Sequence, residues 1–216
     1  MPQMRRKIKL HRINMSNIVF AAISPHPPII LPSVGSEEDR KKVKNTIDAL
    51  QSLGEKLKKA RPEKIIISSP HSDWGFNVPL FFLAQDFEGE IKKYLTGLES
   101  PDEYFQEGKK AYNKTDKRIA LIASGDLSHC LKEDGPYGFN PDGPKFDGDL
   151  IKFLKKKDIK NILKLDRTYP RAAECGLRSF SFLLGVLEAS GANWQPEIVS
   201  YEGPFGVGYL VADFKI

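Results

Sequence analysis

Three of the four histidines in this 216-residue chain follow directly on short apolar runs. They are His26 in the string SPHPP, His71 in SSPHSDW and His129 in ASGDLSH. If the apolar runs are strands of an open α/β sheet, their carboxyl ends bring the three imidazoles to one edge of the sheet, where such folds form their sites. Converging imidazoles bind a transition metal or transfer protons near neutral pH. This spacing therefore predicts a metal-binding or proton-transfer site.

Acidic residues and a thiol offer the remaining ligand. Two neutral imidazoles and one carboxylate form the set that holds non-haem Fe(II), and the same set suits Zn²⁺ with one open position. The candidate carboxylates are Asp73, Asp126 and Glu174. Glu174 is attractive because a buried helix start is an unfavourable place for an unpaired charge, and because the helix dipole favours its anion. The adjacent Cys175 is the alternative ligand as a thiolate. Neighbouring helical residues point about 100° apart, so we expect only one of the two to face the metal.

The third histidine and several aromatic residues fit the same chemistry. An imidazole that does not bind the metal would act as general acid or base. The segment after His71 is rich in Trp and Phe. We interpret Trp74 and Phe76, together with Pro27, as part of the wall of a substrate pocket. The alternative interpretation is that this segment packs in the core.

The elements that would position these residues are visible as apolar patterns. Near-continuous apolar runs at 17–24, 64–69 and 118–123 predict strands that are buried on both faces of a sheet. A helix at 36–60, capped by Ser36, links the first two strands and predicts a parallel pair. The other predicted elements are helices at 101–112, 146–154, 159–165 and 171–190, a covering loop at 132–145, and an antiparallel hairpin with strands at 197–201 and 206–214. The predicted fold class is therefore a single α/β domain, with a central mixed, mainly parallel sheet covered by helices on both faces.

Composition places the chain among ordinary globular proteins, with 40% hydrophobic and 28% charged residues. No apolar run approaches the roughly 18 residues of a membrane span. The net charge is +5, but the basic blocks share predicted helices with acidic residues, so we interpret them as a solvated surface and not as a nucleic-acid site. Two cysteines without a CxxC motif predict a reducing, cytoplasmic location. Residues 1–16 are interpreted as a disordered extension and residues 17–216 as one domain.

Five sequence blocks carry a family resemblance: SPHPPIILP, SSPHSDWG, ASGDLSH, AECGLRSF and SYEGPFGVGYLVA. In this order they resemble the class III extradiol ring-cleavage dioxygenase superfamily of LigB-like catalytic subunits, and within it the AmmeMemoRadiSam-associated and Memo-related branch. The resemblance implies that His26 and His71 bind a non-haem Fe(II) together with an acidic residue, and that His129 is the catalytic acid/base. It implies Glu174 as the third ligand if the chain follows the iron enzymes, and Cys175 if it follows the Memo proteins.

The activity that the resemblance implies is ring opening of a catechol-like diol by O₂, with His129 as the catalytic acid/base. We expect Asp126, three residues earlier, to be the second catalytic residue. Fe(II) is the expected cofactor, and Zn²⁺ or copper is the alternative. The competing interpretations are a Memo-like metal-binding module without ring-cleavage activity and a zinc-dependent hydrolase that uses Asp126 or Glu174 as base. The expected partners are a small aromatic substrate and O₂, a second copy of the chain in a homodimer, and AmmeMemoRadiSam partner proteins. Neither a nucleic acid nor a membrane is expected.

Overall fold

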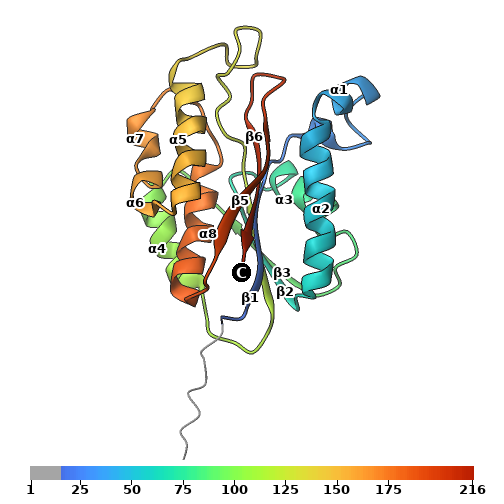
Figure 1. Cartoon of the computed structure of the whole chain (residues 1–216), viewed down its shortest axis with the longest axis vertical. Helices are drawn as coiled ribbons and strands as arrows, with labels where there is room; N and C mark the ends of the chain where they lie inside the picture. The colour runs from blue at the N-terminus through green and yellow to red at the C-terminus, as the bar shows by residue number, and fades with distance from the viewer. Residues whose placement is uncertain (1–15) are drawn as a thin grey trace, which may run out of the picture.

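The computed structural model describes residues 16–216 and contains a six-stranded sheet between two layers of helices (Figure 1). The strands are β1 (Ile18–Ser24), β2 (Lys64–Ser69), β3 (Glu90–Leu95), β4 (Ile119–Ser124), β5 (Gln195–Glu202) and β6 (Tyr209–Lys215). Their order across the sheet is β3-β2-β4-β1-β6-β5. The first four strands in this order are parallel, whereas β6 runs antiparallel to β1, and β5 runs antiparallel to β6. The predicted mixed, mainly parallel sheet with an antiparallel final pair is confirmed.

The three strands that carry the apolar runs form the centre of the sheet. β1, β2 and β4 are almost completely buried because helices cover both of their faces. The edge strand β3 is not predicted from the sequence. In its sequence EIKKYL only Ile91 and Tyr94 are half-buried, and the other four side chains are exposed. A strand that pairs on one side alone tolerates such charge, so its apolar pattern is too weak to detect.

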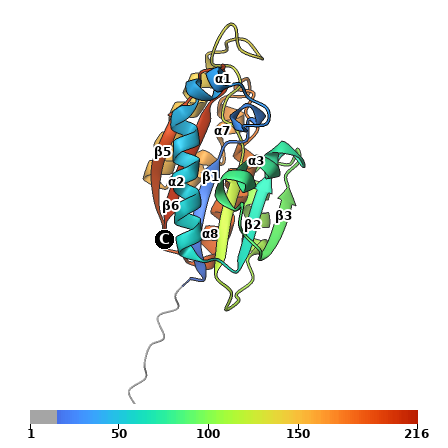
Figure 2. The ribbon, with the colours of Figure 1, turned by 90° about the vertical axis from the view of Figure 1, so that its right-hand side faces the viewer.

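Helices cover both faces of the sheet (Figures 1 and 2). They are η1 (Pro28–Ile30), α1 (Glu37–Lys42), α2 (Lys44–Ala60), α3 (Trp74–Leu83), α4 (Pro101–Ala111), α5 (Asp142–Lys156), α6 (Ile159–Ile162), α7 (Leu165–Thr168) and α8 (Leu177–Ser190). Side chains of α2 and α3 build one core with the sheet, and those of α4, α5 and α8 build the other. Within residues 16–216, none of the helices has the length and apolar character needed to cross a membrane. The predicted N-terminal extension lies, apart from its last residue, outside the described residues.

Several helix boundaries differ from the predicted ones. The helix predicted at 36–60 is interrupted at Val43, whose side chain is completely buried between α1 and α2. Residues 74–83 form the helix α3 although Pro79 lies inside it. α5 begins at Asp142, within the predicted loop. α8 begins at Leu177 and not at 171, because Ala173 has a left-handed backbone (φ 51°) that a helix cannot contain. The residues before Leu177 therefore form a loop.

Candidate metal centre

Three side chains with metal-binding atoms meet where β1 and β2 end and the loop before α8 returns. One ligand atom each from His26, His71 and Cys175 lies within 4.8 Å of the other two. The Nε2 atom of His26 is 3.5 Å from the Sγ atom of Cys175, and the ring centroids of the two histidines are 5.1 Å apart. His26 is buried, Cys175 half-buried and His71 exposed. The cluster therefore opens to solvent on the side of His71.

His26 is fixed by two hydrogen bonds, one to its backbone and one to its ring. Its backbone N–H donates to Oδ1 of Asp126 at 2.9 Å, and its Nδ1 atom is 2.9 Å from Oγ of Ser124. When Nδ1–H donates to this hydroxyl, Nε2 keeps its lone pair and points at Cys175. Burial, reinforced by the neighbouring His71 imidazole, lowers the pKa of His26 to about 3. The ring is therefore neutral at pH 7, as a metal ligand must be.

Cys175 reaches the cluster because two glycines allow their backbones to touch. A Cβ atom on Gly125 would lie 2.2 Å from the Cα of Gly176, so this contact between the loop after β4 and the loop before α8 excludes any side chain at residue 125. The Sγ atom of Cys175 accepts a hydrogen bond from the Asp126 N–H at 3.3 Å. Burial, together with the nearby charge of Asp126, raises the pKa of the Cys175 thiol. A bound cation would supply the charge that stabilises the thiolate.

Glu174, the first choice for the third ligand, is turned away from the cluster. Its Oε2 atom accepts a hydrogen bond from the Leu177 N–H at 2.6 Å, and its Oε1 atom pairs with Arg178 at 3.2 Å. The carboxylate therefore caps the first turn of α8. Burial raises the pKa of Glu174, while the Leu177 and Arg178 contacts oppose that rise. Of the two neighbours, the structure groups the alternative, Cys175, with the histidines.

His129 lies beside the cluster but does not belong to it. Its backbone N–H donates to the carbonyl oxygen of Ala173 at 3.3 Å, and its Nδ1 atom also contacts that oxygen. A carbonyl only accepts, so Nδ1 carries the proton and Nε2 remains the basic nitrogen. The left-handed backbone of Ala173 thus presents one oxygen to both N–H groups of His129. A half-buried imidazole in this tautomer can take a proton from a ligand.

Asp126 connects the loops that carry these histidines. It is 5% exposed, and its Oδ1 atom accepts the bond from His26. Burial raises the pKa of this carboxyl to about 6, while the His26 N–H and the charges of His129 and His71 oppose the rise. Its carboxylate is therefore close enough to His71 and His129 for their charges to act on it.

The predicted pocket residues have different environments. Trp74 begins α3 and is 44% exposed, whereas Pro27 is buried at the start of η1. Phe76 is 4% exposed and packs in the core between the sheet and α2, so the packing interpretation describes it correctly. An aromatic residue that the sequence reasoning missed is Tyr137, whose exposed ring lies 5.3 Å from the His129 ring. Its only signal is its position in the Gly- and Pro-rich stretch that was predicted to cover the site.

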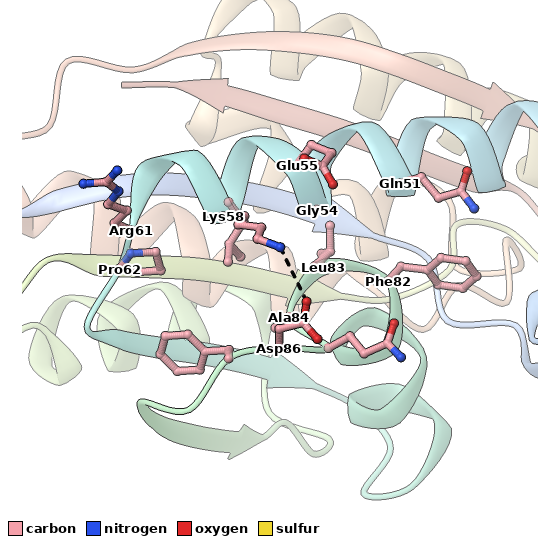
Figure 3. Close-up of a pocket in the computed structure, with 13 residues that line it drawn as sticks. Gln51, Gly54, Glu55, Lys58, Arg61, Pro62, Phe82, Leu83, Ala84 and Asp86 are labelled. Carbon is pink, nitrogen blue, oxygen red and sulfur yellow. Dashed lines mark ion pairs between the residues drawn. The ribbon is translucent and has the colours of Figure 1, made fainter.

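A separate groove lies at the opposite end of the sheet, between α2 and the connection from α3 to β3 (Figure 3). Its volume is about 340 Å³, and the residues that line it include Gly54, Leu57 and Leu83. An ion pair between Lys58 and Asp86 spans it at 3.6 Å, with both side chains largely exposed. None of the candidate site residues lines this groove.

The fold and the cluster define an α/β protein with a metal-type site at the carboxyl edge of its sheet. Residues 72–212 match the family described as the catalytic LigB subunit of aromatic ring-opening dioxygenase, and the chain belongs to this family. The predicted family is thus confirmed. The matched region contains His129, Glu174 and Cys175, and it begins directly after His71.

One relative and one solved structure extend this comparison. Protein CA_C1420 from Clostridium acetobutylicum is 31% identical, over 87% of this chain and 55% of that protein. The chain therefore spans about half the length of this relative. The crystal structure of uncharacterized protein JW3007 from Escherichia coli K12 has a TM-score of 0.62 and 15% identity, and the match covers 90% of this chain and 99% of that one. At this identity the similarity shows a shared fold.

Proposed function

We propose that this chain binds one transition-metal ion through His26, His71 and Cys175 and opens the ring of a small catechol-like diol with O₂. The observation that carries the proposal is the convergence of these three ligand atoms within 4.8 Å, beside a histidine whose Nε2 is basic. Membership of the family of ring-opening dioxygenase subunits supports the reaction type. Fe(II), when bound, supplies the Lewis acidity and the O₂ chemistry that ring opening requires.

The residues of the chain have distinct tasks in this proposal. Nε2 of His129 accepts a phenolic proton from the diol, and the Ala173 carbonyl stabilises the imidazolium that results. The buried carboxylate of Asp126 holds the His26 backbone through the His26 N–H. Tyr137 presents exposed aromatic surface beside His129, where a ring substrate can pack, and Trp74 is exposed three positions after His71 in the chain.

The thiol in the ligand set favours a second candidate function. Cysteine thiolate is a soft ligand that suits zinc or copper, whereas a carboxylate completes the usual site for non-haem iron. A protein that holds zinc or copper through two histidines and one cysteine would be a metal-binding module without ring-cleavage activity. The residue that favours this candidate over the dioxygenase is Cys175, because both candidates use the same two histidines.

Metal analysis combined with a substrate screen tests the proposal. The wild type is purified without oxygen, reconstituted with Fe(II), Zn²⁺ or copper in parallel, and mixed with substituted catechols in air. We expect stoichiometric iron, O₂ uptake and the visible absorbance of a ring-opened product. His129→Ala should keep its iron but lose turnover, because it removes the base and no ligand. Stoichiometric zinc or copper without turnover of any catechol would refute the dioxygenase and support the second candidate.

A further inference from the structure

The segment that carries His129 is held between two loops. On one side the hairpin that joins β5 to β6 binds its backbone, with the Leu127 N–H donating to Gly208 O at 2.8 Å and the Gly208 N–H donating to Ser128 O at 2.8 Å. On the other side the Ser128 hydroxyl donates to Ala172 O at 2.7 Å. These bonds pair the Leu127 N–H and the Ser128 carbonyl, but the backbone N–H of Ser128, a completely buried residue, needs a further acceptor.

A carboxylate from a distant helix provides that acceptor. Oδ1 of Asp147, on α5, accepts the hydrogen bond from the Ser128 N–H at 2.9 Å. Its Oδ2 atom accepts a second bond, at 2.6 Å, from the hydroxyl of Tyr201 on β5. A carboxylate matches two donors without offering one of its own, which neither a hydroxyl nor an apolar side chain can do.

The position of Asp147 is energetically unfavourable for a residue that only fills space. Its side chain is 1% exposed, and within residues 16–216 no ion pair includes it. Burial raises the pKa of its carboxyl to about 7, which measures the cost of a charge there. The neighbouring backbone is also adapted to it, because a Cβ atom on Gly208 would lie 2.3 Å from Oδ2. The site is thus built around this carboxylate.

We propose that Asp147 is a positioning residue for His129. Its carboxylate accepts the hydrogen bond from the Ser128 N–H, and this bond fixes the backbone segment that orients the His129 ring against Ala173. The inference rests on the proposed function only in taking His129 as the base. The hydrogen-bond partners of Asp147 are Ser128 and Tyr201, and neither belongs to the metal cluster. Its removal should therefore disturb His129 and leave the binding of metal by His26, His71 and Cys175 unchanged.

The test uses variants of residue 147 in the full chain and reads His129 directly. Asp147→Leu and Asp147→Ser remove the acceptor for Ser128, the second with a smaller polar side chain in case the first does not fold. Asp147→Asn keeps an oxygen for Ser128. Tyr201→Phe is the matched control, since it removes the other partner and leaves the Ser128 contact in place. Histidine labelled with ¹⁵N reports the His129 tautomer by NMR, amide exchange reports residues 128 and 129, and Co²⁺ titration reports the metal cluster.

We expect at least tenfold faster exchange of the two amides in the Leu and Ser variants, with loss of the Nδ1–H tautomer of His129. The Co²⁺ affinity of the same variants should stay within about threefold of the wild type, and Asp147→Asn and Tyr201→Phe should keep the tautomer. Wild-type exchange and tautomer in a folded Leu or Ser variant would overturn the proposal, as would loss of the tautomer in Tyr201→Phe alone. If the protein turns over a catechol, the Ser variant should lower kcat more than tenfold with little change in KM. If the protein turns over no catechol, the proposed function fails, but the NMR result still decides the role of Asp147.

Discussion

Alanine substitutions of the neighbours Glu174 and Cys175 should change different properties, the first the stability of the fold and the second the binding of metal. Glu174 caps α8 through the Leu177 N–H and pairs with Arg178, but it makes no contact with the histidines. Cys175 contributes its sulfur to the cluster. Glu174→Ala should therefore destabilise the fold and keep the metal, whereas Cys175→Ala should lose the metal and cost little stability.

The size of the Glu174 effect follows from its two contacts. Breaking a buried ion pair by removing one partner costs roughly 3–5 kcal/mol, and losing a helix cap costs about 1 kcal/mol. The Glu174 side chain is 8% exposed, but the Arg178 side chain is 24% exposed and keeps its bond to the Glu99 carbonyl, so the penalty for the stranded guanidinium is reduced. We expect a loss of about 3 kcal/mol in the free energy of unfolding. For a chain of this length that corresponds to a Tm lower by roughly 6–12 °C.

Two measurements on the same samples check the separation. Urea unfolding of the metal-free proteins gives the stability, and titration with Co²⁺ gives the affinity together with the thiolate-to-cobalt absorbance. Glu174→Gln is the control for the cap, because it keeps an oxygen for Leu177 and should lose only about 1–2 kcal/mol of stability. A Glu174→Ala protein with wild-type stability and no cobalt binding would show that the carboxylate is a ligand and that the geometric argument is wrong.

Three further predictions follow from the same geometry. Burial and the nearby charge of Glu174 raise the pKa of Asp147 against the hydrogen bonds from Tyr201 and Ser128, so the folded state holds a proton that the unfolded state releases at about pH 4. The lowered pKa of His26 gives a slope of opposite sign, so stability in urea should fall more, or rise less, between about pH 4 and 7 in the wild type than in Asp147→Asn. Zn²⁺ at a hundred times its Kd should raise the unfolding free energy by about 2.7 kcal/mol, a gain that calorimetry should not find when one of the three ligands is replaced. Gly125→Ala should lower the free energy of unfolding by about 1–3 kcal/mol and weaken metal binding, because the added Cβ would overlap Gly176.

Each of these predictions has an outcome that contradicts it. The same dependence of stability on pH in the wild type and in Asp147→Asn would show that the Asp147 carboxyl does not release a proton on unfolding in this range. Equal stabilisation by Zn²⁺ in the wild type and in a ligand variant would indicate that the ion binds elsewhere. A Gly125→Ala protein with unchanged metal affinity would show that the two loops can separate without moving Cys175.

The parts of the structure that the sequence predicts are those governed by burial. The runs that form β1, β2 and β4 are apolar because both sheet faces are covered. Each of the three histidines comes shortly after one of these runs in the sequence, so its place at the carboxyl edge of the sheet could be predicted. β3 escapes detection because Lys92 and Lys93 are exposed at the edge. The choice between Glu174 and Cys175 depends on where α8 begins, and that is decided by the backbone of Ala173, which no periodicity reveals. Asp147 is also invisible in sequence, since its partners come from β5 and from the loop after β4.

The spread of the ligands along the chain determines when the metal centre can form. His26 and Cys175 are 149 positions apart, and each follows a different part of the sheet. No local stretch of the growing polypeptide contains the complete set, so a ribosome-bound chain that ends before residue 175 has both imidazoles of the cluster but not its thiol. In the proposed function, binding of a metal by all three ligands is therefore a late event in the synthesis of this protein. The ion would join positions that are far apart in the chain, and folding has to bring these positions together before the ion can bind.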